Sequence, residues 1–286
     1  MATTPYRIAF LTDIHGNVHG LAAVLAAIRR DAPDLIVVGG DLTYKFPYPR
    51  ETLELLATVE HQAIAGNTDR YVTAWATHDT WPDWLPVAGL PHARWTREQI
   101  GDDWAAQIAA LPPQLTLSMA GAAGGAGDIL VVHGIPGNPF VGIHHPPGPE
   151  NLHPQWALHE TQLDRHLAGV RAPLILTGHT HIPMLRQWRD STIVNPGAVA
   201  YTWHPTPDTH LARYALLTYR PGQPWQVEMR TVPYDNAAAL RGLREIETQN
   251  PLVEQVVRLI TPPGVVVGRG SYPEGHDMIR AWKSEQ

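Results

Sequence analysis

The chain has no cysteine among its 286 residues, which excludes disulfide bonds, thiolate metal ligands and a cysteine nucleophile. It also lacks an excess of positive charge, because 21 lysine and arginine residues face 27 aspartate and glutamate residues, for a net charge of −6. No overall positive field would gather a polyanion, so we expect no long nucleic acid as a partner. The residues in unusual supply are 16 histidines and ten tryptophans.

Long apolar runs are missing as well. No stretch approaches the roughly 18–20 residues that a membrane span needs, and the first residues lack the basic start and apolar core of an export signal. We therefore expect a cytoplasmic protein without a membrane partner. Apolar residues make up 44% of the chain, which is typical of a globular protein with a sizeable core. No visible boundary divides the chain, so we expect one domain over residues 1–286.

Short runs rich in β-branched residues alternate with helical patterns over the first two-thirds of the chain, which favours βαβ units and an α/β fold. The runs predicted to be strands span residues 6–11, 35–38, 61–65, 129–132 and 174–177. Helices are predicted over about 21–30 and 53–59, from a capping-box pattern at 96–99 to residue 111, and over about 236–248. Between the last two helices, alternation at 216–219 and 226–229 predicts antiparallel strands.

Each of the five predicted strands of the first two-thirds is followed by a glycine-containing turn with polar side chains. These side chains are Asp13 and His15, then Asp41, Asn67, His133, and finally His179 and His181. Ligand crevices of open α/β sheets lie outside the carboxyl ends of the strands, so we expect the seven to converge. A single aspartate or histidine there is most often a cap or turn residue, but capping does not select histidine four times. The pattern therefore predicts a metal site.

The donor set indicates which ions would bind. Oxygen and imidazole donors without a thiolate suit Mn²⁺, Fe²⁺, Co²⁺ or Zn²⁺ better than Ca²⁺ or Mg²⁺. Seven donors are too many for one tetrahedral site, but they fit two ions if one carboxylate bridges them. Paired ions roughly 3.5–4 Å apart serve in-line displacement at phosphorus, so the implied substrate is a phosphate ester.

At this point the chain resembles the calcineurin-like metallophosphoesterase superfamily. Its five blocks are Asp-x-His, Gly-Asp, Gly-Asn-His-Asp/Glu, His-Gly and Gly-His-x-His, and they occur here in that order between Asp13 and His181, the third with one departure. The opening Asp-Ile-His-Gly-Asn at 13–17 and the Asn-Pro-Gly at 195–197 resemble its small bacterial phosphodiesterase branch. The resemblance implies a four-layer α/β/β/α sandwich of two mixed sheets flanked by helices, with the second sheet drawn from the region after about residue 111.

The resemblance also implies two divalent ions, manganese first, with iron, zinc, cobalt or nickel as alternatives. It assigns Asp13, His15 and His181 to one ion, Asn67, His133 and His179 to the other, and Asp41 to both. A hydroxide bridging the ions would attack phosphorus, its pKa lowered by the cations. Asp41, Asn67 and His133 are accordingly the catalytic candidates.

The third block departs from the family pattern, because Thr68 stands where the family has a histidine that assists the departing oxygen. Threonine cannot act as an acid near pH 7, and general acid help contributes typically 10²–10⁴-fold. We therefore expect phosphodiesters or activated phosphomonoesters as substrates, unless His19, His144 or His145 supplies the proton. Arg70 could clamp a phosphate through its planar fork. For each of these four residues an ordinary surface or capping role is the alternative.

Three segments have roles that the motifs do not fix. Residues 71–127 contain tryptophans 75, 81, 84, 95 and 104. Aromatic residues at helical spacing are usually core, and the alternative is a lid whose tryptophans stack a nucleobase and favour a nucleotide substrate. Residues 134–154 are expected at the mouth of the site, and residues from about 235 to 286 are expected to form a C-terminal extension.

A different class of function is a non-catalytic scaffold for protein interactions, which some relatives of this fold become after losing metal ligands. All seven expected ligands are present here. The sequence therefore favours a metal-dependent phosphoesterase with a small phosphate-ester substrate, and it leaves the oligomeric state open.

Overall fold

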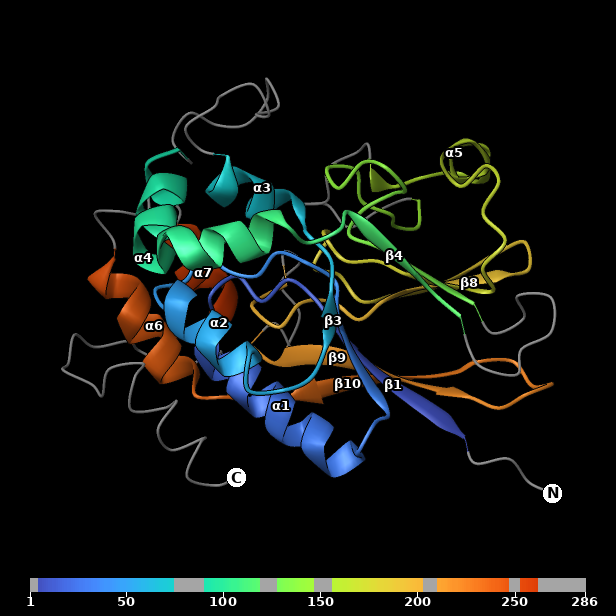
Figure 1. Cartoon of the computed structure of the whole chain (residues 1–286), viewed down its shortest axis with the longest axis horizontal. Coiled ribbons are helices and arrows are strands. Elements are labelled where there is room, and N and C mark those ends of the chain that lie inside the picture. Colours follow the sequence, from blue (N-terminus) through green and yellow to red (C-terminus); the bar gives the residue numbers. More distant parts are fainter. Residues whose placement is uncertain are drawn as a thin grey trace.

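Two five-stranded sheets form the centre of the computed structural model, which describes residues 5–74, 90–118, 128–146, 156–202, 210–246 and 253–261 (Figure 1). The first sheet has the order β10 (Gln226–Val232), β9 (Ala212–Tyr219), β1 (Tyr6–Leu11), β2 (Leu35–Val38), β3 (Gln62–Ala63). The second has the order β4 (Gln114–Leu117), β5 (Ile129–Val132), β6 (Leu174–Leu176), β8 (Ser191–Asn195), β7 (Met184–Trp188).

Both sheets are mixed. In the first sheet, β1 pairs in parallel with β2 and antiparallel with β9. In the second sheet, β5, β6 and β8 run parallel, while β4 and β7 pair antiparallel at the two edges. The expectation of two mixed sheets flanked by helices is thus confirmed.

Alternation along the strands divides each sheet into an inner and an outer face. Along β1, Ile8 and Phe10 point into a core between the sheets, where they meet Val131 and Leu174 of the second sheet. Their neighbour Ala9 packs instead into the core under the helices of the first sheet. The outer face of the second sheet is covered in the same way by α5 (Glu160–His166). The result is the helix, sheet, sheet, helix layering seen in Figure 1.

The helices of the first sheet are α1 (Val18–Asp31), α2 (Pro49–Leu56), α3 (Asn67–Thr73) and α4 (Leu90–Ala109). The side chain of Asn17 caps α1 by accepting the backbone N–H of Gly20, which places the start of α1 directly after the first polar turn. Near the C-terminus, α6 (Asn236–Glu245) and α7 (Val253–Ile260) pack together around the buried Tyr201. None of the described helices is both long and apolar enough to cross a bilayer.

The structure corrects two predicted boundaries. The capping-box prediction at 96–99 is wrong, because Thr96 is fully buried within α4, which already runs from Leu90. The break in this helix falls at Gly101, whose φ of 77° is a left-handed conformation that glycine adopts readily. The third predicted strand is also too long, since only Gln62 and Ala63 pair with β2.

The tryptophan-rich segment is described in part. Its residues 75–89 and 119–127, with tryptophans 75, 81 and 84, lie outside the described residues. Trp104 packs against the core under the first sheet, and Trp95 packs against the cluster formed with α6 and α7. These two tryptophans are packing residues in the described part of the chain. The lid prediction concerned the whole segment and stays a prediction.

Candidate metal centre

The predicted ligands lie at the carboxyl ends of strands from both sheets. Asp13 and Asp41 follow β1 and β2, and Asn67 begins α3 just after β3. His133 follows β5, and the turn after β6 carries His179 and His181. The seven side chains are all buried, none more than 6% exposed. Strands of two separate sheets therefore deliver the polar groups to one place.

Four of the ligands form one compact group. Donor atoms of Asp13, His15, Asp41 and His181 all lie within 4.8 Å of one another. His181 Nε2 is 3.0 Å from His15 Nε2 and 3.2 Å from Asp13 Oδ1. Two ligands bound at about 2.0–2.2 Å from one ion lie about 3–3.5 Å apart, so this spacing fits a shared cation. We call Asp13, His15 and His181, with Asp41, the first subsite.

The remaining ligands adjoin this group through Asp41. Asn67 Oδ1 is 3.0 Å from His133 Nε2 and 2.8 Å from His179 Nδ1. Asp41 Oδ2 is 3.4 Å from His133 Nε2 and 3.5 Å from His15 Nε2. We call Asn67, His133 and His179, with Asp41, the second subsite. Asp41 lies between the two subsites.

Each of the four imidazoles is oriented by a backbone carbonyl. His15 Nδ1 donates to Tyr44 O, His133 Nδ1 to Gly39 O, His181 Nδ1 to Tyr201 O and His179 Nε2 to Phe140 O, at 2.7–3.2 Å. A carbonyl can only accept a hydrogen bond, so the other ring nitrogen of each histidine faces the cluster and can offer a lone pair there once it is unprotonated. The facing Nε2 atoms of His15 and His181, 3.0 Å apart, need a proton or a metal cation between them. The donor set therefore fits metal ions.

The backbone at the ligands is strained. Asp13, His15, Asp41, His179 and His181 all have φ between 52° and 67°, in the left-handed region that non-glycine residues seldom occupy. Each such residue costs on the order of 1–3 kcal/mol, which the surrounding structure must offset. Strain concentrated at five ligands marks these turns as functional.

Two positions show why glycine accompanies the ligands. A Cβ on Gly66 would collide with the Asp41 carboxylate, and a Cβ on Gly178 would collide with Thr12 and come within 2.7 Å of Asp13 Oδ2. The glycines thus let neighbouring turns approach the two carboxylates closely.

The Asp41 turn is held by Thr68 and Asp69. The Thr68 N–H donates to Asp41 Oδ1 at 2.9 Å. The buried Asp69 carboxylate accepts the N–H groups of Asp41, Leu42 and Gly66 at 2.8–2.9 Å. Sequence reasoning assigned no role to Asp69, although the acidic residue that ends the third block was the available signal. Its role is to fix the turn that carries the Asp41 carboxylate.

Burial and charge set the protonation of the ligands. Burial opposes ionisation of Asp41, but His133 and His15 outweigh it and hold the pKa of Asp41 well below its usual range. Burial lowers the pKa of His179 to about 3, with His133 adding to the effect. Burial also disfavours the charged form of His133, yet Asp41 and Asp13 raise its pKa to about 10. A metal ion binding His133 must therefore displace a proton.

A buried lysine stands beside the first subsite. Lys45 is 8% exposed, and its ammonium donates a hydrogen bond to the hydroxyl of Tyr201. Burial lowers the pKa of Lys45 to about 8, although Asp41 and Asp13 favour its charge. The Tyr201 ring in turn lies 4.6 Å from the His181 ring. Sequence reasoning missed both residues, because a lysine four residues after Asp41 gives no signal of burial.

The predicted substrate contacts are scattered. Thr68 is buried at the Asp41 carboxylate, and its hydroxyl has no hydrogen-bond partner among the described residues. Arg70, in α3, is half-buried and forms no ion pair with any described residue. His19 is buried in the first turn of α1 and packs edge-on against Tyr48, with ring centroids 5.5 Å apart.

The histidine pair lies on the segment that follows β5. His144 is half-buried, and its Nδ1 donates to the carbonyl of His145 at 3.0 Å. His145 is exposed, with Nε2 3.4 Å from the carbonyl of Leu185 on β7.

A tryptophan from outside the tryptophan-rich segment touches the second subsite. The rings of Trp156 and His179 meet edge-on with centroids 4.4 Å apart. Trp156 Nε1 donates to Phe140 O at 3.2 Å, the same carbonyl that accepts from His179. No motif pointed to this residue, because its contact is made by an irregular segment without periodic spacing.

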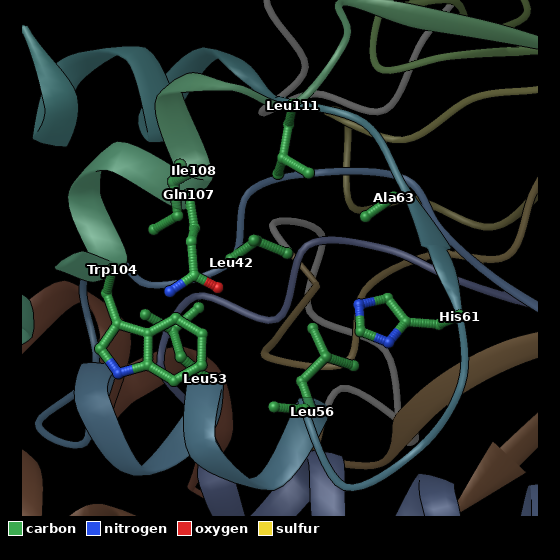
Figure 2. A pocket seen from close by; sticks show the side chains of 10 residues that line it. Leu42, Leu53, Leu56, His61, Ala63, Trp104, Gln107, Ile108 and Leu111 are labelled. Carbon is green, nitrogen blue, oxygen red and sulfur yellow. The ribbon is translucent and has the colours of Figure 1, made fainter.

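An apolar pocket of about 140 Å³ lies between α2 and α4, away from the ligands (Figure 2). Leucine side chains and the ring of Trp104 line it, with His61 and Gln107 as its more polar lining side chains. None of the seven ligands belongs to its wall. The pocket is separate from the metal centre.

The chain is similar to known proteins in sequence and in structure. The family model described as calcineurin-like phosphoesterase matches residues 6–183, more than half of the chain. An uncharacterized protein of Methanocaldococcus jannaschii is 24% identical over 194 residues, which are 67% of this chain and 69% of that protein.

Two solved structures share the fold. A hypothetical protein of Pyrococcus horikoshii matches with a TM-score of 0.69 at 22% identity, covering 91% of this chain and 100% of that one. A metallophosphoesterase of Sphaerobacter thermophilus matches with a TM-score of 0.63 at 23% identity, covering 88% of this chain and 98% of that one. These structural matches share the α/β sandwich, and the family match over residues 6–183 bears out the resemblance to the calcineurin-like phosphoesterases.

Proposed function

The chain belongs to the calcineurin-like phosphoesterase family, and we propose that it is a dinuclear metal-dependent phosphoesterase acting on small phosphodiesters or activated phosphomonoesters. Manganese is the proposed ion at both subsites. When bound, two divalent cations would lower the pKa of a water nucleophile and neutralise charge on the phosphoryl oxygens.

One observation carries the dinuclear proposal. Four imidazole nitrogens, two carboxylates and the Asn67 carbonyl converge, and the other ring nitrogen of each imidazole donates outward to a backbone carbonyl. So many acceptors around one point are stable only with cations among them. Because Asp41 lies between the subsites at nearly equal distances from His133 and His15, it is the group suited to hold both ions.

The residues around the ligands define what the substrate would meet. The half-buried Arg70 guanidinium suits two phosphate oxygens, since its planar fork can donate two parallel hydrogen bonds. Thr68 offers a buried hydroxyl in place of an acid. A leaving group would then depart with little proton transfer, which favours esters of acidic alcohols and phenols.

The test uses protein stripped of metal by a chelator. We expect release of p-nitrophenol from bis-p-nitrophenyl phosphate only after Mn²⁺ is added, and faster than from p-nitrophenyl phosphate. A preference for the monoester would replace the diester proposal, and turnover without any metal would contradict the metal dependence. If neither ester were cleaved and no ion bound, a scaffold function would take the place of catalysis.

A further inference from the structure

We propose that Trp156 is a positioning residue of the second subsite, which sets how tightly that subsite holds its ion without supplying a ligand. The inference rests on the proposed dinuclear function. It concerns the orientation of the His179 imidazole, which three contacts hold in place.

The first contact is the shared carbonyl. His179 Nε2 and Trp156 Nε1 both donate to Phe140 O, each at 3.2 Å. The carbonyl fixes which nitrogen of His179 is protonated, and the second donor fixes where the carbonyl points. Loss of the indole N–H would free the carbonyl to turn away from His179.

The second contact is the edge-on packing of the two rings. The Trp156 ring meets the His179 ring at 64°, with centroids 4.4 Å apart. Gly142 lies beneath both, since a Cβ there would come within 3.2 Å of Trp156 Cγ and 3.3 Å of His179 Cδ2. The imidazole is thereby confined on the side away from Asn67, so its Nδ1 stays directed at the cluster.

The third contact ties Trp156 to the second sheet. The N–H of His144 donates to Trp156 O at 2.8 Å. The guanidinium of Arg186, a residue of β7 that is 4% exposed, donates to the carbonyls of His144 and Leu158 at 2.9 and 2.7 Å. The segment around Trp156 is thus held to a buried charged group. The indole position does not depend on its own ring contacts alone.

The other three imidazoles are oriented by carbonyls of more deeply buried residues. Their carbonyl partners belong to the buried residues Gly39, Tyr44 and Tyr201. Phe140 is half-buried and lies in the irregular segment after β5. Partners of metal-ligating histidines are worth about 10–100-fold in metal affinity, so a helper at the least buried of the four carbonyls should be measurable.

The experiment titrates metal-free full-length protein with Co²⁺ by calorimetry. Trp156→Phe keeps a ring against His179 but cannot donate to the Phe140 carbonyl. We expect the wild type to bind two equivalents, and Trp156→Phe to bind one of them about tenfold more weakly with the other unchanged. A purely structural role would weaken both ions or neither, and either result would overturn the inference.

The matched control is Trp188→Phe. Trp188 is 2% exposed and its indole N–H donates to Asp164 Oδ1 at 3.0 Å, so this variant also loses a buried ring contact and a hydrogen bond. It should bind both ions as the wild type does. In this control, binding of the weaker Co²⁺ ion should quench part of the tryptophan emission, because Trp156 is still present. Trp156→Phe should lack that part of the quenching. Equal quenching in the two variants would contradict the proximity of the second ion to Trp156.

Two further results separate this inference from the proposed function. A wild type that binds fewer than two equivalents would overturn the dinuclear proposal and the inference with it. Two equivalents in the wild type, with an unaffected Trp156→Phe, would overturn the inference alone. If Trp156→Phe does not fold, Arg186→Met should weaken the same ion by a smaller factor, because methionine donates to neither carbonyl, and unchanged affinity there would also reject the inference.

Discussion

The two subsites are built differently, although they share Asp41. In the first, His15 and His181 are anchored by carbonyls of Tyr44 and Tyr201, which are 4% and 0% exposed. In the second, His179 depends on Phe140, a half-buried residue in an irregular segment. Well-packed surroundings resist local opening, so the first subsite should be preformed and the second adjustable. Under the proposed dinuclear function, the first ion would therefore be held permanently and the second exchanged.

The largest effect should come from removing what the two subsites share. Asp41→Asn loses the negative charge between the ions and should lower kcat/KM for bis-p-nitrophenyl phosphate by about 10³-fold, which corresponds to about 4 kcal/mol of transition-state stabilisation. Asp34→Asn, at the opposite end of β2, is the matched control and should retain activity. Near-normal turnover by Asp41→Asn would show that this carboxylate does not bridge.

Removing one histidine from each subsite tests the asymmetry directly. His181→Ala and His179→Ala should each lose about 10²-fold in activity at limiting Mn²⁺, because each loses a ligand. Excess Mn²⁺ should rescue His179→Ala more than His181→Ala, since only the second subsite is expected to exchange its ion. Equal rescue of the two variants, measured as turnover against Mn²⁺ concentration, would remove the distinction between the subsites.

A pH effect on stability is expected from His19, in the first turn of α1. Burial lowers the pKa of His19 in α1 to about 4, and Asp235 opposes this only in part. His19 in the unfolded chain then binds a proton with a pKa of 6.5, whereas in the folded chain it does so only near pH 4. The stabilisation present above pH 6.5 is therefore lost as the pH falls toward 4. Between pH 7 and 5 this amounts to about 2 kcal/mol of unfolding free energy.

The measurement is urea unfolding of metal-free protein at both pH values. The variant His19→Leu should lack this share of the pH dependence, so the difference between wild type and variant isolates it. An identical dependence in both proteins would place the acid sensitivity elsewhere.

The smallest predicted effect concerns Thr68, whose N–H donates to the Asp41 carboxylate. Thr68→His should restore a proton donor beside Asp41 and raise the rate with phenyl esters, relative to p-nitrophenyl esters, by about tenfold, the low end for an acid that is not optimally placed. Thr68→Asn, which adds a polar side chain without an acid, is the control. A ratio unchanged by histidine would show that this position does not face the leaving group.

Much of the site could be predicted because its ligands follow strands at glycine turns, a pattern visible in the sequence itself. The orienting partners could not, since backbone carbonyls such as those of Phe140 and Tyr44 are present at every residue and carry no signal. Burial of Lys45 was equally hidden, because only the packing of Tyr201 against it reveals a cation inside the molecule.

The fold was predicted to a similar extent, and the predictions that were wrong failed for physical reasons. The central strands β1, β2, β5 and β6 stood out as apolar runs, whereas β4, β7 and β8 were not placed, and β7 alternates between buried and exposed residues. The helix break fell at Gly101 rather than at the polar pattern around Thr96, because Thr96 is buried where a cap would face solvent. Local signals gave way to tertiary packing in both cases.

The left-handed turns at the five ligands also bear on how this protein can change over time. Glycine adopts their backbone angles without penalty, so a change such as Asp13→Gly or His15→Gly would relax the chain while it removed a ligand. A substitution that removes a ligand in this way would therefore raise the free energy of unfolding. Homologous chains that carry glycine at these positions should be stable proteins without catalytic activity. Keeping all five side chains lowers the free energy of unfolding of this chain.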